Sequence, residues 1–266
     1  MKKLFYIFFA LILSLSPAFA LDGLEYIHKE EGVHIYKIDT KKLGRKVKPY
    51  VADELMTAKA LFETGDYALV VNGGFFDRET GKEISFIMIN GKLENTPFNN
   101  NRAMTLIKKT GRFKEVINRS ELRIFEPEYN KYVFRIAPHF APDADKIFLK
   151  HSLQAGPMLY PMYDPQSEGF VQKDDDGQIT LDSCDMTKRR PRTIIGIKGK
   201  YLYIIAFSMS KKMTGEELHE FVKKQKFKQA MALDGGGSTS MMSDDVQIVS
   251  EGTEGRKVKS FLVIER

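Results

Sequence analysis

Short apolar runs separated by turn residues recur along this chain of 266 residues, and they constrain its fold more than any other feature. Short runs that are apolar throughout, or that alternate apolar and polar residues, are typical of β-strands. They cover residues 33–38, 47–51, 67–71, 132–136, 230–233 and 258–264. Asn90-Gly91 lies between apolar residues, and both positions favour the positive φ angles of a two-residue hairpin turn. Thr110-Gly111 and Lys198-Gly199-Lys200 are predicted to close two further hairpins.

Helical patterns are few. Residues 53–63 have apolar side chains at helical spacing, behind an aspartate at position 53 that is suited to cap the helix. Thr214 and Glu217 fit a capping box for a second helix over 214–224. The chain shows neither an internal repeat nor a low-complexity linker. We therefore expect one α+β domain over residues 21–266, with a largely antiparallel or mixed β-sheet core.

The N-terminus has the three parts of a bacterial secretory signal peptide. Two lysines are followed by a mostly apolar stretch, residues 4–15, and then by Pro17-Ala18-Phe19-Ala20, a small-x-small cleavage pattern. The apolar stretch is shorter than the roughly 18–20 residues that span a bilayer. We expect residues 1–20 to be removed near Ala20, which would leave a secreted or periplasmic protein without an integral membrane segment.

Charge and reactive side chains exclude several classes of function. Removal of Lys2 and Lys3 lowers the formal net charge from +6 to +4, which suits an anionic ligand. Basic residues do not gather into runs with aromatic residues between them, so nucleic-acid binding is not expected. The single cysteine, Cys184, allows no internal disulfide, and its acidic neighbours disfavour a reactive thiolate. Histidines lack metal-ligand spacing, and the Asp-rich 174–177 lacks the other ligands of a calcium loop, so neither a metal nor a cofactor is expected.

The most informative local motif begins at Asp234. Three glycines and three hydroxyl residues follow this carboxylate directly, and the apolar run 230–233 precedes it. Consecutive glycines allow successive backbone N–H groups to turn toward one point, which creates a concave site for anions. The sequence therefore predicts a phosphate pocket beside Asp234. A nucleotide-binding P-loop is disfavoured because no lysine follows the glycines.

Three more segments complete the pattern. Asn72-Gly73-Gly74-Phe75-Phe76-Asp77 follows another apolar run, Gly156-Pro157 comes later, and Arg192-Thr193 begins the segment that ends at Ile197. Together with residues 234–240, these segments resemble the motifs of the phosphodiester glycosidase family, in the same order. Ala155 stands where the family usually has the first glycine of Gly-Gly-Pro. The resemblance runs from about residue 32 to residue 266.

The resemblance implies cleavage of the bond between an anomeric carbon and a phosphodiester oxygen. Such a reaction needs a carboxylate near the oxocarbenium-like centre and cationic or N–H donors around the leaving phosphate. The carboxylate candidates are Asp234 and Asp77, and Asn72 is the third candidate catalytic residue. The expected phosphate clamp is Arg192, because its planar fork of donors matches phosphate oxygens. The remaining candidates for substrate binding are Gly73, Gly74, Gly156, Thr193, Gly235, Gly236, Gly237, Ser238 and Thr239.

Several alternatives remain open from the sequence. Asp77 fits a turn cap as well as a catalytic acid, and Asn72 fits a turn residue as well as a ligand of the sugar or phosphate. One of Phe75 and Phe76 is expected in the core, although both could present a stacking face to a sugar. The leading hypothesis is a secreted hydrolase of sugar-1-phosphodiesters in envelope or extracellular glycans. The alternative is a non-catalytic protein that binds phosphoglycans or exopolysaccharide.

Overall fold

The strands form three sheets and a separate hairpin. The computed structural model describes residues 21–266, and the predicted signal peptide lies outside the described residues. The first sheet has the order β1 (Leu24–Glu30), β2 (Val33–Asp39), β14 (Tyr201–Phe207), β13 (Arg192–Lys198), β15 (Gln229–Ala232), β10 (Met158–Tyr160). The second has the order β17 (Gln247–Val249), β16 (Ser240–Met242), β4 (Tyr67–Asn72), β18 (Val258–Glu265), β3 (Val47–Met56). The third has the order β6 (Lys92–Asn95), β5 (Ile87–Ile89), β9 (Leu149–Gln154), β7 (Ser120–Glu128), β8 (Lys131–Pro138).

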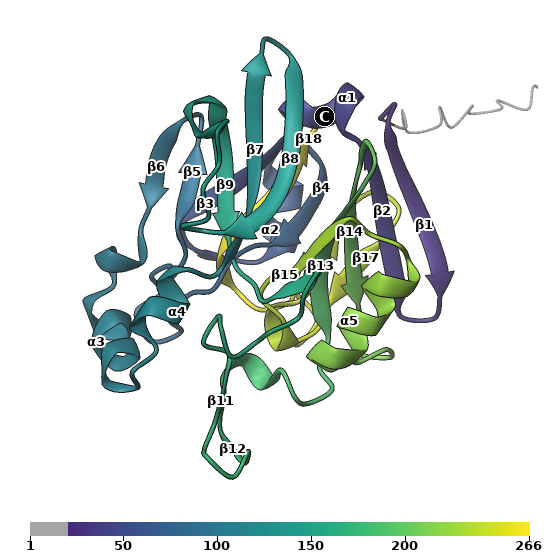
Figure 1. Cartoon of the computed structure of the whole chain (residues 1–266). Helices are drawn as coiled ribbons and strands as arrows, with labels where there is room; N and C mark the ends of the chain where they lie inside the picture. Colours follow the sequence, from purple (N-terminus) through teal and green to yellow (C-terminus); the bar gives the residue numbers. More distant parts are fainter. Residues whose placement is uncertain (1–20) are drawn as a thin grey trace, which may run out of the picture.

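The remaining two strands and the helices complete the fold (Figure 1). Strands β11 (Val171–Lys173) and β12 (Ile179–Asp182) form the hairpin that extends away from the body of the molecule. The helices are α1 (Thr40–Leu43), α2 (Ala58–Thr64), α3 (Asn101–Lys109), α4 (Phe113–Ile117) and α5 (Gly215–Lys224). Strand pairing within the described residues is antiparallel throughout. The predicted α+β class with few helices is therefore confirmed.

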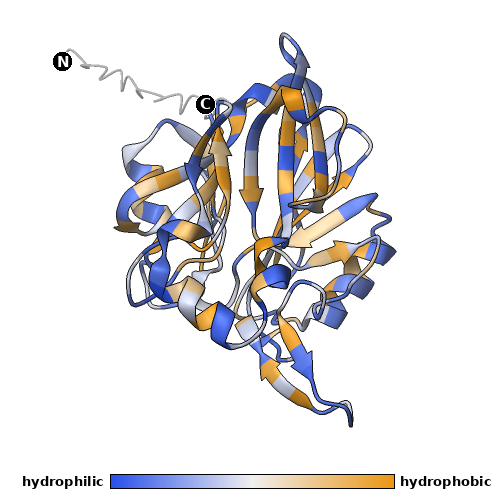
Figure 2. Cartoon of the chain, turned by 60° about the vertical axis from the view of Figure 1, so that its left-hand side comes forward, coloured by the Kyte–Doolittle hydropathy of each residue, from blue (hydrophilic) through white to orange (hydrophobic). Residues whose placement is uncertain are grey.

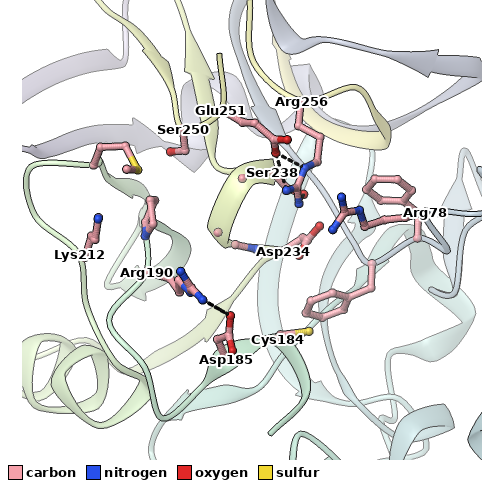
Figure 3. A pocket seen from close by; sticks show the side chains of 17 residues that line it. Arg78, Cys184, Asp185, Arg190, Lys212, Asp234, Ser238, Ser250, Glu251 and Arg256 are labelled. Carbon is pink, nitrogen blue, oxygen red and sulfur yellow. Dashed lines mark hydrogen bonds and ion pairs between the residues drawn. The ribbon is translucent and has the colours of Figure 1, made fainter. Parts of the chain in front are cut away.

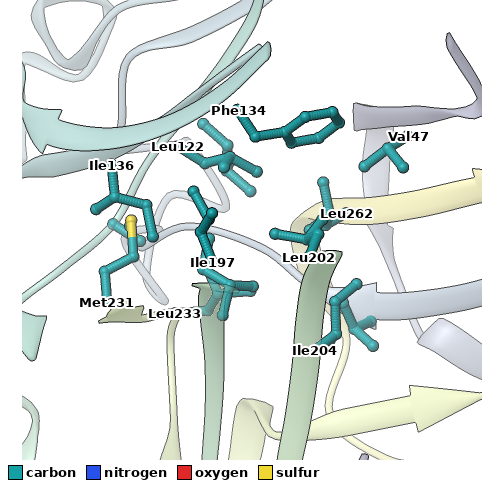
Figure 4. Close-up of a cluster of buried hydrophobic side chains, with 14 of the residues drawn as sticks. Val47, Leu122, Phe134, Ile136, Ile197, Leu202, Ile204, Met231, Leu233 and Leu262 are labelled. Atoms are coloured by element: carbon teal, nitrogen blue, oxygen red, sulfur yellow. The ribbon is translucent and has the colours of Figure 1, made fainter. Parts of the chain in front are cut away.

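The main apolar core lies where the three sheets meet (Figure 4). Side chains on a strand alternate between its two faces, so one strand can serve two apolar layers. On β13, Ile195 and Ile197 enter this central core, whereas Ile194 packs in a second cluster with α5. In β18, Leu262 faces the central core and Phe261 faces a third cluster with α2. Burial of each such side chain stabilises the fold by roughly 1.5–3 kcal/mol.

Hydropathy along the chain matches this arrangement. Figure 2 shows hydrophobic residues concentrated on the strands and hydrophilic residues on helix surfaces and connecting loops. In α5, Leu218 and Val222 are fully buried at helical spacing, and Thr214 with Glu217 forms the predicted capping box. None of the helices within residues 21–266 is long and apolar enough to cross a bilayer. The glycine motif follows β15 of the first sheet and precedes β16 of the second sheet, so it lies between these two sheets.

Two local predictions are wrong. Residues 53–56 belong to strand β3, which pairs with β18 at Val51 and at Met56 with an irregularity between them, and Thr57 rather than Asp53 caps α2. Thr110-Gly111 connects α3 to α4 instead of closing a hairpin. Gly111 does have a positive φ of 70°, but helix–helix connections use the same conformation as hairpins. By contrast, Asn90-Gly91 closes β5–β6 and the turn at Gly199 closes β13–β14, as predicted.

Candidate functional site

Asp234 occupies the crossing from the first sheet to the second. Strand β15 ends at Ala232, a short 3₁₀ helix η5 spans Gly236–Ser238, and β16 begins at Ser240. The backbone N–H of Leu233 donates to the Thr193 carbonyl at 2.8 Å, which extends the pairing of β15 with β13. The N–H of Asp234 then donates to the Gly73 carbonyl of the second sheet at 3.0 Å. The carboxylate is therefore carried by a backbone that is fixed on both sides.

Asn72 holds this crossing together. Its side chain is completely buried and donates from Nδ2 to the Asp234 carbonyl at 2.6 Å. Its Oδ1 accepts from the Thr193 hydroxyl at 2.6 Å and from the Ser240 N–H at 3.1 Å. One amide thus links β4, β13 and both ends of the glycine turn. Asn72, expected as a catalytic residue, and Thr193, expected to bind substrate, instead fix the position of Asp234.

The other glycine segments also support the turn. Gly73 donates its N–H to the Ser260 carbonyl at 2.9 Å, and Gly74 donates to the Ser260 hydroxyl at 3.0 Å. Gly156 donates to the Ala232 carbonyl at 3.0 Å, has a φ of +92°, and would place a Cβ only 2.5 Å from Glu168 Oε2. Neither Gly73, Gly74 nor Gly156 lines the pocket that contains Asp234. Their absence of side chains serves close backbone packing.

Arg192 does not fit the expected role of phosphate clamp. Its side chain is 3% exposed and lies behind the pocket wall. Nε donates to the Met213 carbonyl, Nη1 to the Cys184 carbonyl and Met186 sulfur, and Nη2 to the Asp185 and Lys188 carbonyls. An arginine has five N–H donors, so none is left for a ligand. Arg192 instead fixes residues 184–188, which form part of the wall.

The pocket around Asp234 has a volume of about 630 Å³, which is within the usual range for small-molecule sites. Figure 3 shows Asp234 in its centre, with cationic side chains on several sides. The wall is formed by Phe75, Phe76, Arg78, Cys184, Asp185, Arg190, Pro191, Met209, Lys212, Asp234, Gly235, Gly236, Gly237, Ser238, Ser250, Glu251 and Arg256. The glycine motif and the two phenylalanines of the second motif therefore meet at one cavity.

The cations of the pocket differ in how they are neutralised. Arg190 forms an ion pair with Asp185 at 2.8 Å, and Arg256 pairs with Glu251. Arg78 and Lys212 have no ion pair or side-chain hydrogen bond with any residue from 21 to 266. Figure 3 shows Arg78 directed toward Asp234. The pocket thus presents two uncompensated positive charges around one carboxylate, an arrangement suited to an anionic ligand.

Asp234 itself is half-buried. Its Oδ1 accepts the N–H of Gly235 at 2.8 Å. Burial raises the pKa of this carboxyl to about 6, although hydrogen bonds from Ser238 and Gly235 oppose the shift. The group is therefore ionised at neutral pH and close enough to its pKa to exchange a proton. That combination suits a nucleophile or a base.

The turn glycines do not form the continuous anion cradle that three adjacent amides suggest. The Gly235 N–H is bonded to Asp234, and the Gly236 N–H donates to the Pro191 carbonyl at 2.9 Å. Gly237 is needed for another reason, because a Cβ there would lie 2.2 Å from Glu251 Oε2 and 2.3 Å from Arg256 Nη2. The Arg256–Glu251 pair thus lies directly on the Gly237 backbone, beside the pocket.

The hydroxyls beyond the glycines point to different surroundings. Ser238 is buried, lines the pocket and accepts a long hydrogen bond of 3.4 Å from Arg256 Nη1. Thr239 is fully buried, and its hydroxyl has no partner within the part of the chain that the structure describes. Ser238 is therefore placed to contact a ligand, whereas Thr239 lies behind the wall.

Asp77 faces away from the pocket. Its carboxylate accepts from Arg102 Nη1 at 2.9 and 3.0 Å and from the Glu79 N–H at 3.0 Å. Burial alone would raise the pKa of Asp77, but the hydrogen bonds from Glu79 and Arg102 outweigh it and lower the pKa. The geometry matches the turn-capping alternative for Asp77. Of the two carboxylate candidates, Asp234 is the one that lines the cavity.

The sequence analysis did not identify the polar side chains that reach the cavity from segments outside the four motifs. Arg78, Arg190, Lys212, Glu251 and Arg256 were not among the candidates. Arg78 directly follows the second motif and Arg190 lies two residues before Arg192, so proximity to a motif was an available signal for both. Lys212, Glu251 and Arg256 carry no local signal, because only the tertiary fold brings 209–212 and 250–256 to the turn.

Glu83 is a second unexpected acid. It is 1% exposed, pairs with Phe76 in an isolated β-bridge, and neither carboxyl oxygen has a hydrogen-bond partner in the described chain. Burial raises the pKa of Glu83 to about 8, although the nearby Ser260 hydroxyl, which lies outside hydrogen-bond geometry, opposes the shift. The carboxyl is therefore protonated at neutral pH. No three His, Cys, Asp or Glu side chains from 21 onward are grouped to hold a metal ion.

Comparison with solved structures agrees with this fold. The catalytic domain of zebrafish N-acetylglucosamine-1-phosphodiester alpha-N-acetylglucosaminidase, auto-inhibited by its pro-peptide, superposes with a TM-score of 0.59 and 14% identity, covering 91% of this chain and 81% of that one. A candidate exported protein from Burkholderia pseudomallei K96243 gives a TM-score of 0.55 and 12% identity, covering 88% and 74%. A hypothetical protein from Synechocystis gives 0.50 and 12%, covering 91% and 61%.

Matches to sequence families are more specific than the fold. No curated protein matches the chain. The model of the phosphodiester glycosidase family matches residues 65–265, which include all four motif segments and the Asp234 pocket. The chain belongs to the phosphodiester glycosidase family.

Proposed function

We propose that this protein is a secreted hydrolase that cleaves the glycosidic bond of sugar-1-phosphodiesters in envelope or extracellular glycans. The observation that carries the proposal is the pocket: an ionised carboxylate, Asp234, faces a cavity whose wall contains the unpaired cations Arg78 and Lys212. The zebrafish relative is named for a reaction of this chemical class. Family membership supports the class of bond that is cleaved. The pocket supplies groups suited to both the sugar side and the phosphate side of that bond.

The reaction requires charge stabilisation on both sides of the breaking bond. As the bond between the anomeric carbon and the phosphodiester oxygen breaks, positive charge develops on the sugar and negative charge on the leaving phosphate. Asp234 would stabilise the sugar side, either by attack at the anomeric carbon or by taking a proton from water. Arg78 and Lys212, assisted by Ser238, would stabilise the phosphate side. A phosphate leaves readily, so a separate proton donor contributes less than in other glycosidases.

Residues behind the pocket would act as positioning residues. In this proposal Asn72, Thr193, Gly73, Gly74 and Gly156 keep the Asp234 backbone in place, and Arg192 keeps the opposite wall in place. Gly235, Gly236 and Gly237 form the floor beside the carboxylate. Accurate placement matters because a catalytic group that shifts by about 1 Å can lose on the order of a hundredfold in rate.

Release of free sugar from synthetic sugar-1-phosphodiesters tests the proposal. The wild-type chain should release sugar, and Asp234→Asn should reduce kcat by about a thousandfold or more while leaving the thermal unfolding temperature within a few degrees. Asp53→Asn is the matched control, because Asp53 is exposed on β3 and lies outside the pocket. Equal turnover by wild type and Asp234→Asn would remove Asp234 from the mechanism.

The same substrates separate hydrolysis from recognition alone. A non-catalytic phosphoglycan-binding protein would use the same cations to bind the diester without cleaving it. Calorimetry that shows binding, combined with no release of sugar over a long incubation, would favour that function. Export is tested separately: the mature protein should begin at Leu21, which mass spectrometry of the expressed chain measures.

A further inference from the structure

A second cavity adjoins the Asp234 pocket. It has a volume of about 330 Å³ and shares two wall residues, Phe76 and Arg78, with the pocket. Its wall contains two acids, Asp77 and Glu79, and four arginines. We call this cavity the arginine cleft, because Arg78, Arg102, Arg112 and Arg119 line it. Helices α3 and α4, which carry no family motif, supply much of the wall.

Arg119 is the unusual member of this set. It is only 7% exposed, and its guanidinium stacks 3.9 Å from the ring centre of Phe170 and 5.1 Å from that of Phe75. Its Nε donates to the Glu168 carbonyl at 3.0 Å. Neither Nη atom has a hydrogen-bond partner, and no carboxylate lies within 4.0 Å, among the residues described. Burial of a cation without a paired anion is costly, so this guanidinium is suited to an anionic ligand.

Nearby acids are already engaged. The Glu168 carboxylate accepts from the Ser120 and Met158 backbone N–H groups, both at 2.6 Å. Glu168 and Cys184 act on Arg119 only through longer-range electrostatics. Neither of these groups therefore neutralises the guanidinium directly.

The rest of the cleft remains positive as well. Arg102 binds Asp77 at 2.9 Å and Glu79 at 2.5 Å, so both acids of the wall are paired with one arginine. Arg112 donates to the Thr110 hydroxyl at 3.0 Å and to the Gly169 carbonyl at 2.8 Å.

Glu115 approaches Arg112 without forming an ion pair within 4.0 Å in the described chain. Arg78, which also lines the Asp234 pocket, forms no ion pair in the described chain.

We propose that the arginine cleft is a second phosphate-binding subsite, so that the substrate is a glycan with phosphodiesters at successive linkages. This inference rests on the proposed function of the Asp234 pocket and extends it. One phosphate would lie in the pocket during cleavage, and the next phosphate along the chain would be held by Arg112 and Arg119. Phe76 lines both cavities, so its ring is placed to contact the sugar between the two phosphates.

Binding of inorganic phosphate tests the cleft without any assumption about catalysis. In a ¹⁵N NMR titration of the chain from residue 21, phosphate should shift amides at 76–78 and 112–119. Arg112→Gln and Arg119→Met should each raise the Kd for phosphate, as these shifts report it, at least tenfold. Arg45→Gln, an exposed arginine in a different surface depression, should leave them unchanged. If Arg119→Met does not fold, Arg112→Gln alone gives the result.

Shifts confined to the 234–238 turn, or equal affinity in Arg112→Gln and wild type, would overturn the subsite.

Turnover then tests the substrate class. A synthetic glycan with two successive phosphodiesters should have a kcat/KM at least tenfold above that of the analogue with one, and Arg112→Gln should reduce this ratio to near one. Equal kcat/KM for the two substrates in the wild type would overturn the proposed substrate. If the wild type cleaves neither substrate, the proposed hydrolase activity fails, while the phosphate titration still decides whether the cleft binds anions.

Discussion

The glycine turn at 234–240 and the arginine cleft beside α3 differ in how their buried polar groups are satisfied. Behind the turn, Arg192 has all five donors bonded and Asn72 makes three hydrogen bonds. In the cleft, Arg119 makes one hydrogen bond and keeps its Nη groups without a partner in the described structure. The motif segments therefore contain most of the framework, and segments outside the motifs contain several of the groups available to a ligand.

This difference changes how the motifs are interpreted. A polar residue within a family motif suggests ligand contact, yet Asn72, Thr193 and Arg192 all bind the protein's own backbone or side chains. Conversely, Arg78 and Lys212 carry no partner in the described chain and lie in the cavity wall. Motif residues here define where the pocket is, and neighbouring residues define what charge it presents.

Replacement of the two buried arginines gives the sharpest test of this comparison. Arg192→Met should lower the free energy of unfolding by about 3–5 kcal/mol, because it leaves several buried carbonyl oxygens without a donor. Arg119→Met should change it by about 1 kcal/mol or less, since the lost hydrogen bond is offset by removal of an unpaired buried cation. Urea denaturation measures both values, and equal losses would contradict the difference between the two arginines.

Asn72→Ala should destabilise the fold by about 2–4 kcal/mol. The substitution removes three hydrogen bonds and leaves the Asp234 carbonyl, the Thr193 hydroxyl and the Ser240 N–H unsatisfied in a buried location. Denaturant unfolding measures the loss, with Asn101→Ala as control because Asn101 is exposed at the start of α3. A change below about 0.5 kcal/mol would show that Asn72 does not hold the turn.

Glu83, which pairs with Phe76 of the second motif, is a buried acid whose carboxyl oxygens have no hydrogen-bond partner in the described chain. Its pKa is raised from 4.5 to about 8, so its contribution to stability is present below pH 4.5 and is lost as pH rises through 8. Glu83→Gln lacks this loss, so from pH 4.5 to pH 8 the free energy of unfolding of wild type should fall by about 4 kcal/mol relative to that of the variant. Melting curves at the two pH values, with exposed Glu54→Gln as control, measure the effect.

The pH dependence of turnover gives the smallest expected effect. Asp234 must be ionised to act as nucleophile or base, and its pKa is raised to about 6. Turnover should therefore fall roughly tenfold for each pH unit below 6, while a circular dichroism spectrum shows that the fold persists. A rate that stays constant down to pH 4.5 would contradict ionised Asp234 as the reacting group.

Short-range patterns of residues were sufficient to predict most of the secondary structure. Alternation in 33–38 predicted a strand, because side chains project from alternate faces of the backbone, and the apolar run 261–264 within 258–264 predicted another. The capping box at Thr214 and the turn at Asn90-Gly91 are also short-range signals, and both were confirmed. At 53–56 the helical spacing of apolar residues predicted a helix, but these residues belong to strand β3, which pairs with the distant β18.

The strand-rich class, the family and the carboxylate of the pocket could be predicted from the sequence, since each depends on short local patterns of residues. The packed sheets were needed to show that Arg192 faces the interior, that Asp77 binds Arg102, and that Arg78 and Lys212 line the same pocket as Asp234. The direction of a long polar side chain depends on which distant carbonyls and charges surround it. Those neighbours exist only after the sheets have packed.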